Sequence, residues 1–98
     1  MIVTSNRIPV HPDHAAAFEE TFKNRASQVD TMDGFISFQL LRPTTDGDPY
    51  IVMTMWESQE HFEAWTNSAA FKEGHGKSGT LPRETFLDRP TLEIHEVI

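Results

Sequence analysis

The sequence contains no cysteine, and it is poor in basic residues. Without cysteine the chain can form neither a disulfide nor a thiolate site, which is consistent with the cytoplasm, and we expect that location. Lys and Arg number 8 against 15 Asp and Glu, so the net charge is −7. No cluster of basic side chains is visible, and clustered Lys and Arg are what phosphate binding requires. We therefore expect no nucleic-acid partner.

Long apolar runs are also missing. No stretch approaches the roughly 20 apolar residues of a membrane span, and the N-terminus MIVTSNRIPV has no apolar run of signal-peptide length. We expect no membrane association. With 98 residues, 38% of them hydrophobic, the chain is predicted to be one domain, residues 1–98, near the size at which a single core is just adequate.

The periodicity of apolar residues predicts the order of elements. The predicted segments are a strand over 2–10, a helix over 11–29, a turn at Asp33-Gly34, strands over 35–42 and 50–57, a second helix broken at 67–68, a loop over 76–89 and a strand over 91–98. This order is the split βαβ, or ferredoxin-like, arrangement. It predicts an α+β fold with a four-stranded antiparallel sheet and helices on one face. The other face needs cover, so we expect a homodimer.

Asn6 is an unusual residue in the first predicted strand, because asparagine is depleted in strands. It shares a strand face with the apolar Ile2, Ile8 and Val10. A buried amide without partners costs about 1–3 kcal/mol. One interpretation is that Asn6 bonds to neighbouring backbone or water, as buried amides usually do. The other is that its amide faces a ligand in a cleft.

The stretch FEAWTNSAAFKEGH, residues 62–75, places two rings around a helix break. Asn67-Ser68 is a stop-and-restart signal, because Ser can cap a following helix. A break would let Trp65 and His75 point into one cleft. The structural alternatives are that Trp65 belongs to an apolar stripe, like Phe22 in the first helix, and that His75 is a solvated surface group.

With these residues in view, the chain resembles the IsdG-type haem-degrading monooxygenases. They belong to the antibiotic-biosynthesis-monooxygenase superfamily of dimeric α+β barrels. The resemblance spans nearly the whole length. Its anchors are Asn6, GFISFQLLRP at 34–43, the strand ending MWES at 55–58 and AWTNSAAFKEGH at 64–75. The combination of Asn, Trp and His is the specific part of the pattern.

The resemblance implies an enzyme that uses haem as both cofactor and substrate, and that opens the ring and releases iron with dioxygen and electrons from an external donor, a reductase not identified by the sequence. By resemblance, His75 is the axial ligand to iron, Asn6 hydrogen-bonds the distal oxygen species, and Trp65 presses on the porphyrin and ruffles it. Phe22 matches a position that lines the haem pocket. Arg25 matches a position near the propionates in some members.

Two other functions stay open at this point. One is a cofactor-independent monooxygenase of the antibiotic-biosynthesis type that oxidises a phenolic or quinone substrate. The other is a non-catalytic haem-binding module with the same fold. The remaining histidines lack the spacing of a zinc site, and no Ser-His-Asp order or Gly-rich phosphate loop is present.

Overall fold

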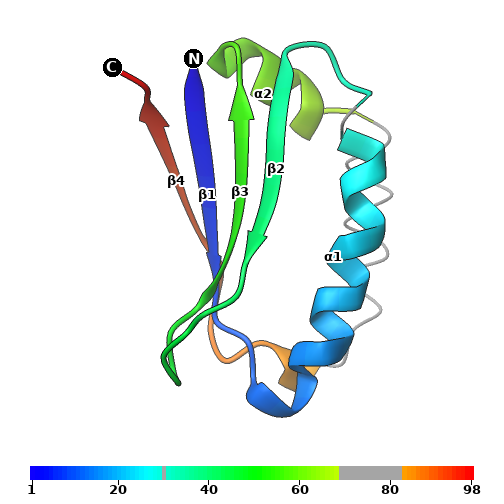
Figure 1. The fold of residues 1–98 in the computed structure, drawn as a ribbon, viewed down its shortest axis with the longest axis vertical. Helices are drawn as coiled ribbons and strands as arrows, with labels where there is room; N and C mark the ends of the chain where they lie inside the picture. The colour runs from blue at the N-terminus through cyan, green and yellow to red at the C-terminus, as the bar shows by residue number, and fades with distance from the viewer. Residues whose placement is uncertain (30, 69–82) are drawn as a thin grey trace.

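The computed structural model describes residues 1–29, 31–68 and 83–98. The elements are β1 (Ile2–Ile8), η1 (Pro12–His14), α1 (Ala15–Val29), β2 (Phe35–Leu41), β3 (Tyr50–Trp56), α2 (Gln59–Thr66), η2 (Arg83–Thr85) and β4 (Thr91–Glu96). The strands form one sheet in the order β2-β3-β1-β4, and every neighbouring pair is antiparallel (Figure 1). The ferredoxin-like α+β prediction is confirmed, whereas the assignment of all of 1–98 to one domain stays a prediction.

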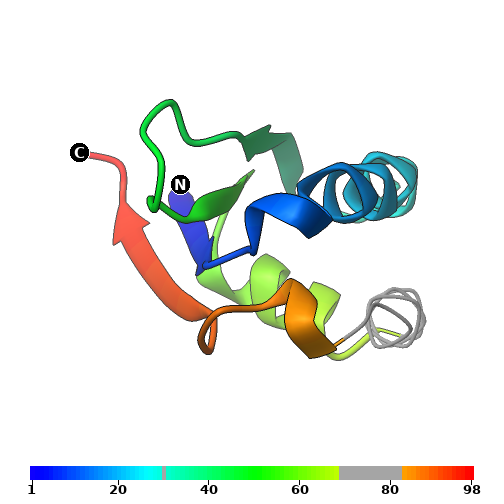
Figure 2. The same ribbon diagram turned by 90° about the horizontal axis from the view of Figure 1, so that it is seen from below.

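Both helices lie on the same side of the sheet, which Figure 2 shows from below. On β1 the even-numbered Ile2, Thr4 and Ile8 are buried beneath this layer. Because strand side chains alternate, Val3 and Arg7 point to the opposite side. We call the two sides of the sheet the helix-facing side and the helix-free side.

Several boundaries differ from those predicted. The first strand ends at Ile8 because Pro9 has no N–H for the ladder. Val10 instead forms an isolated bridge with Phe86, inside the segment predicted to be loop, which also contains the short 3-10 helix η2. The first helix opens as a 3-10 turn, in which the His11 side chain accepts a hydrogen bond from the Asp13 N–H at 3.1 Å.

Two apolar clusters pack on the helix-facing side. The first joins β1 and β3 to α1 through buried side chains: Ile8, Val10, Phe18, Phe22 and Tyr50. The second contains Ile2 and Trp56, with partly buried neighbours that come from the α1–β2 connection, β2 and α2: Met32, Phe35, Phe38, Phe62 and Trp65. The two clusters meet at Phe38 of β2, which packs against both, and together they hold the two helices against the sheet.

The predicted turn at Asp33-Gly34 brings α2 against the start of β2. Gly34 has φ +78, a left-handed conformation that favours glycine. A Cβ there would also lie 2.2 Å from Cγ of His61. The Gly34 carbonyl accepts a hydrogen bond from the Glu57 N–H at 2.8 Å. Glycine is therefore required at this position both by its backbone angle and by the approach of His61.

Candidate functional site

Asn6 lies in the middle of β1 and points to the helix-facing side. It is paired with Val52 on β3 and with Leu92 on β4, and it is half-buried. No residue in the described part of the chain makes a hydrogen bond to its side-chain amide. A side-chain amide in this position can donate to and accept from either a ligand or water, so both interpretations of Asn6 stay predictions.

Next to Asn6, three side chains form a buried, neutral hydrogen-bonded chain. Thr4 and Thr54 face each other across β1 and β3, and their hydroxyl oxygens are 2.5 Å apart. The indole N–H of Trp56 donates to Oγ1 of Thr54 at 3.0 Å. Thr4 and Thr54 are only 3% and 7% exposed, and Trp56 is fully buried. We call these three residues the Thr–Trp chain.

Trp65 stands at the C-terminal end of α2 and is half-buried. Its ring stacks on that of Trp56, with centroids 6.5 Å apart and planes inclined by 27°. The helix ends next to it, because Asn67 is the C-cap and both the N–H and the hydroxyl of Ser68 donate to the Trp65 carbonyl, at 3.0 and 2.6 Å. The predicted helix end at 67–68 is confirmed.

The structure describes the other predicted site residues to different extents. Phe22 is buried in the first apolar cluster, with its ring centroid 4.7 Å from that of Phe18. Its packing interpretation is thereby confirmed, and its role in a ligand pocket stays a prediction. The backbone of Arg25 belongs to α1, but its side chain lies outside the described part. His75, and with it the predicted meeting of His75 and Trp65 in one cleft, lies outside the described residues.

A charged network joins α1 to the far end of the sheet. Arg42, which follows β2, donates from Nε to Oε2 of Glu19 at 2.8 Å and from its other nitrogen to Oε1. The hydroxyl of Tyr50 donates to the same carboxylate at 2.5 Å. These hydrogen bonds lower the pKa of Glu19 to about 2, the bond from Arg42 contributing most. Burial raises the pKa of Tyr50.

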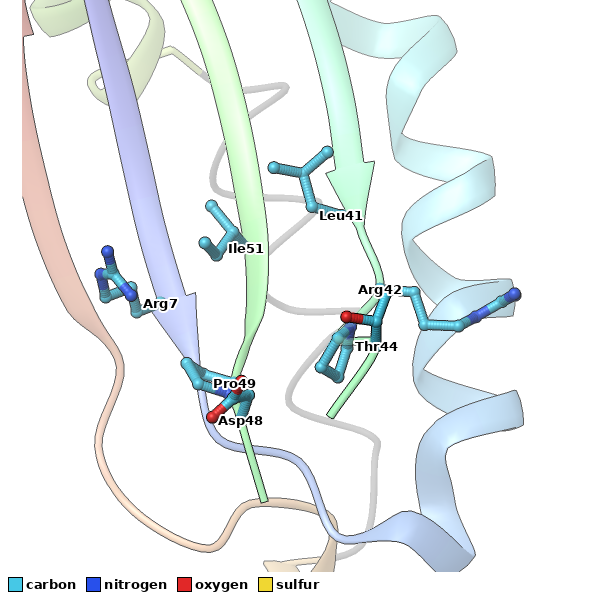
Figure 3. Close-up of a pocket in the computed structure, with 8 residues that line it drawn as sticks. Arg7, Leu41, Arg42, Thr44, Asp48, Pro49 and Ile51 are labelled. Atoms are coloured by element: carbon cyan, nitrogen blue, oxygen red, sulfur yellow. The ribbon is translucent and has the colours of Figure 1, made fainter. Parts of the chain in front are cut away.

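A hollow of about 350 Å³ lies on the helix-free side of the sheet, near the β2–β3 hairpin. Figure 3 shows Arg7, Leu41 and Ile51 reaching it from three adjacent strands, whereas the Arg42 side chain points toward α1. Register places these three side chains on the face opposite Asn6. Asn6 and the hollow are therefore separated by the sheet, and they do not belong to one site.

Among residues 1–29, 31–68 and 83–98, no group of three or more His, Asp or Glu side chains is arranged to hold a metal ion. Nor is any helix in this part of the chain long and apolar enough to cross a membrane. His75, the one predicted ligand to iron, lies outside these ranges.

Sequence reasoning missed the Thr–Trp chain. Thr4 shares the strand face of Asn6 by simple alternation, and Trp56 lies within the recognised MWES block, so both carried a signal. What the sequence did not supply is the register of β1 against β3, which sets Thr4 opposite Thr54.

Comparison with known proteins gives a consistent picture. Residues 1–77 match the family model described as antibiotic biosynthesis monooxygenase. The "Heme-degrading monooxygenase" of Bacillus cereus (strain B4264) is 36% identical over 90 residues, which are 90% of this chain and 82% of that protein. The "Heme oxygenase (mycobilin-producing)" of Mycobacterium tuberculosis (strain CDC 1551 / Oshkosh) is 42% identical over 69 residues, 70% of this chain and 66% of that protein.

Solved structures agree on the fold. The heme degrader MhuD from Mycobacterium tuberculosis, with two hemes bound in its active site, matches with a TM-score of 0.79 and 34% identity, covering 100% of this chain and 96% of that one. SnoaB, a cofactor-independent oxygenase from Streptomyces nogalater, matches with a TM-score of 0.80 at 20% identity, covering 99% and 92%. The second likeness shows the fold alone. With a family model matched over residues 1–77 and relatives above 30% identity across most of the chain, the protein belongs to the antibiotic biosynthesis monooxygenase family.

Proposed function

We propose that this protein is a haem-degrading monooxygenase. The observation that carries the proposal is the 36% identity, over 90% of the chain, to a relative named for haem degradation. The cofactor-independent oxygenase of the same fold is only 20% identical, so it offers fold similarity without support for that chemistry. An enzyme that opens haem is therefore favoured over the phenol-oxidising alternative.

The described side chains fit a flat, largely apolar ligand that carries one polar centre. Phe22 and Trp65 belong to separate apolar clusters on the helix-facing side. Asn6 lies on the same side, and no described residue makes a hydrogen bond to its side-chain amide. Apolar walls with a few placed polar groups are typical of ligand sites. When bound, haem would supply the iron that activates dioxygen and the ring that is opened.

Within this proposal each site residue has a role. His75 would hold the haem iron, and neutral imidazole is suited to that task. Asn6 would direct its side-chain amide, a fixed dipole, toward the haem and would hydrogen-bond the reacting dioxygen. Trp65 would pack against the porphyrin and Phe22 would line the pocket. Arg25 would pair with the propionates. The reaction consumes dioxygen and electrons from an external reductase, and we expect it in the cytoplasm.

We further propose that the protein works as a homodimer packed through the helix-free side of its sheet. Apolar side chains on this side come from adjacent strands and are half-buried or exposed in the single chain: Val3, Leu41, Ile51, Met53 and Met55. A second sheet would remove them from water, and burial of apolar area is worth about 25 cal/mol per Å². Two such sheets face to face form the dimeric α+β barrel of the family resemblance.

Haem titration tests the function. We expect a Soret band when haem is added to the protein, and loss of that band when a reductant and air are supplied. A stable band under those conditions would indicate a haem-binding module without activity. No band at all would support the cofactor-independent monooxygenase.

His75→Ala tests the ligation. We expect this variant to lose most haem affinity or to give an altered Soret spectrum, while its far-ultraviolet circular dichroism stays that of the parent. His14→Ala is the matched control, because His14 lies in η1 beside His11, at the start of α1. An unchanged spectrum and affinity in His75→Ala would support the alternative that His75 is a solvated surface group.

Sedimentation equilibrium tests the assembly. We expect twice the chain mass of 11.2 kDa at micromolar concentration. Met53→Glu, on the helix-free side of β3, should shift the population to monomer, because the interface would then bury an unpaired charge from each protomer. A parent protein that sediments as a monomer would refute the sheet-on-sheet dimer.

A further inference from the structure

We infer that Trp56 is a positioning residue for Trp65, and that its orientation is set by the hydrogen bond to Thr54. The inference rests on the proposed function in one respect only, namely that Trp65 contacts the bound haem. It adds three side chains to the site, Thr4, Thr54 and Trp56, none of which touches the ligand in the proposed arrangement.

The first step is the anchoring of the Trp56 ring. The indole has a single N–H donor, and Oγ1 of Thr54 accepts it at 3.0 Å. Trp56 has no exposed surface, so rotation of the ring would leave a buried donor without a partner, which is unfavourable. Thr54 is held in turn by the hydroxyl of Thr4, 2.5 Å away on the neighbouring strand.

The second step is the packing around the ring. Phe35 of β2 and Phe62 of α2 approach Trp56 edge-on, with centroids 5.7 and 6.1 Å away and planes inclined by 79° and 62°. Of its three aromatic partners among the described residues, Trp65 is the one that stacks on it, at 27°. Offset stacks and edge contacts are the preferred aromatic geometries. The Trp56 plane is therefore fixed on several sides, and the Trp65 plane follows it.

The third step is the connection to Asn6. Thr4 and Asn6 are two residues apart on β1 and face the same side, a separation of about 7 Å along the strand. The Thr–Trp chain thus begins two residues from Asn6 on β1 and ends at Trp56, whose ring stacks on that of Trp65 of α2. A single buried hydrogen-bonded unit relates the polar and the aromatic group of the proposed site.

A direct test of the geometry uses the fact that the chain has only two tryptophans. Two indole N–H signals are therefore expected in a ¹H–¹⁵N spectrum, and Trp65→Phe assigns them. In Thr54→Val the acceptor is lost at nearly constant volume. We expect the Trp56 signal to move, its exchange with solvent to accelerate, and the near-ultraviolet circular dichroism of the Trp pair to change. Thr54→Ser keeps the hydroxyl and should restore all three.

The functional arm compares the same variants with haem. We expect Thr54→Val to bind haem with an affinity within about twofold of the parent, to show weaker out-of-plane haem modes in resonance Raman spectra, and to degrade bound haem at least threefold more slowly. Thr54→Ser should recover the parent rate. A merely structural role for Thr54 would lower the melting temperature and leave the rate per folded, haem-loaded molecule unchanged.

The outcomes separate the two proposals. If the parent protein binds no haem, the proposed function fails, while the indole signals still decide whether Thr54 orients Trp56. If Thr54→Val leaves both indole signals and the haem turnover unchanged, the positioning role is overturned and the proposed function stands. Should Thr54→Val fail to fold, Thr4→Val tests the same chain by removing only its outer hydrogen bond, with a smaller change of the same sign expected and an unchanged spectrum counting against the inference.

Discussion

Two hydrogen-bonded networks in the described part of this protein differ in charge and in exposure. The Thr–Trp chain is neutral and buried and lies beside Asn6. The network of Glu19, Arg42 and Tyr50 is charged, and its Arg42 side chain is 71% exposed. A neutral buried network holds one geometry at every pH in which the fold exists, whereas a charged one contributes stability that depends on pH.

The difference indicates a division of labour. The charged network ties α1 to the ends of β2 and β3 at the side of the first apolar cluster. The Thr–Trp chain lies among the residues of the second cluster, under Trp65. We expect variants in the charged network to change stability and leave haem chemistry nearly intact, and variants near Asn6 and Trp65 to do the reverse where packing is preserved.

Trp56→Ala should have the largest effect on stability. Trp56 is fully buried at the centre of the second cluster, and removal of a buried aromatic ring typically costs about 3–5 kcal/mol. Urea denaturation followed by far-ultraviolet circular dichroism measures the loss.

Trp65→Phe is the control, because Trp65 is only half-buried and much of its volume is kept. Its melting temperature should stay within a few degrees of the parent, with haem binding retained and the degradation rate clearly reduced. Equal losses of stability in the two variants would contradict the assignment of Trp56 to core packing and of Trp65 to the ligand site.

Acid should weaken the charged network next. The pKa of Glu19 is about 2 in the folded protein against an ordinary 4.5, so its stabilising effect is complete above pH 4.5 and is lost as the pH falls from there toward 2. After allowance for solvent screening at the exposed Arg42, we expect this loss to lower the free energy of unfolding by roughly 2 kcal/mol.

Glu19→Gln supplies the reference for that measurement. Parent and variant should differ in free energy of unfolding at pH 7. The difference should shrink as the pH falls below 4.5 and should be largely lost as the pH falls through about 2, the folded-state pKa of the Glu19 carboxyl. A difference that is the same at pH 3 and pH 7 would show that the hydrogen-bond geometry, rather than the charge, is responsible.

Asn6→Ala should have the smallest effect on stability and a selective effect on turnover. The Asn6 amide has no hydrogen-bond partner among the described residues, so its removal breaks no bond there. We expect haem still to bind and its degradation to slow at least tenfold, which corresponds to about 1.4 kcal/mol of activation free energy. Stopped-flow absorbance at the Soret band measures the rate. Equal turnover in parent and variant would leave Asn6 with a structural role only.

Local signals in the sequence determined much of this protein. The alternation of Ile2, Thr4, Asn6 and Ile8 predicted one face of β1, and all four lie on the helix-facing side. Gly34 predicted the turn before β2, and Asn67 with Ser68 predicted the end of α2. Each of these signals acts within one strand, turn or helix end, where backbone preference and side-chain period are set by neighbouring residues.

Only the tertiary structure decided which faces meet. The period of each strand predicts that Thr4 and Thr54 face inward. It does not predict that they lie opposite each other, because a shift of register would pair different residues. The stacking of Trp65 on Trp56 and the joining of Glu19 to Arg42 likewise depend on where the helices pack. These contacts link residues distant in the chain, so their free energy becomes available only when the whole sheet and both helices are assembled.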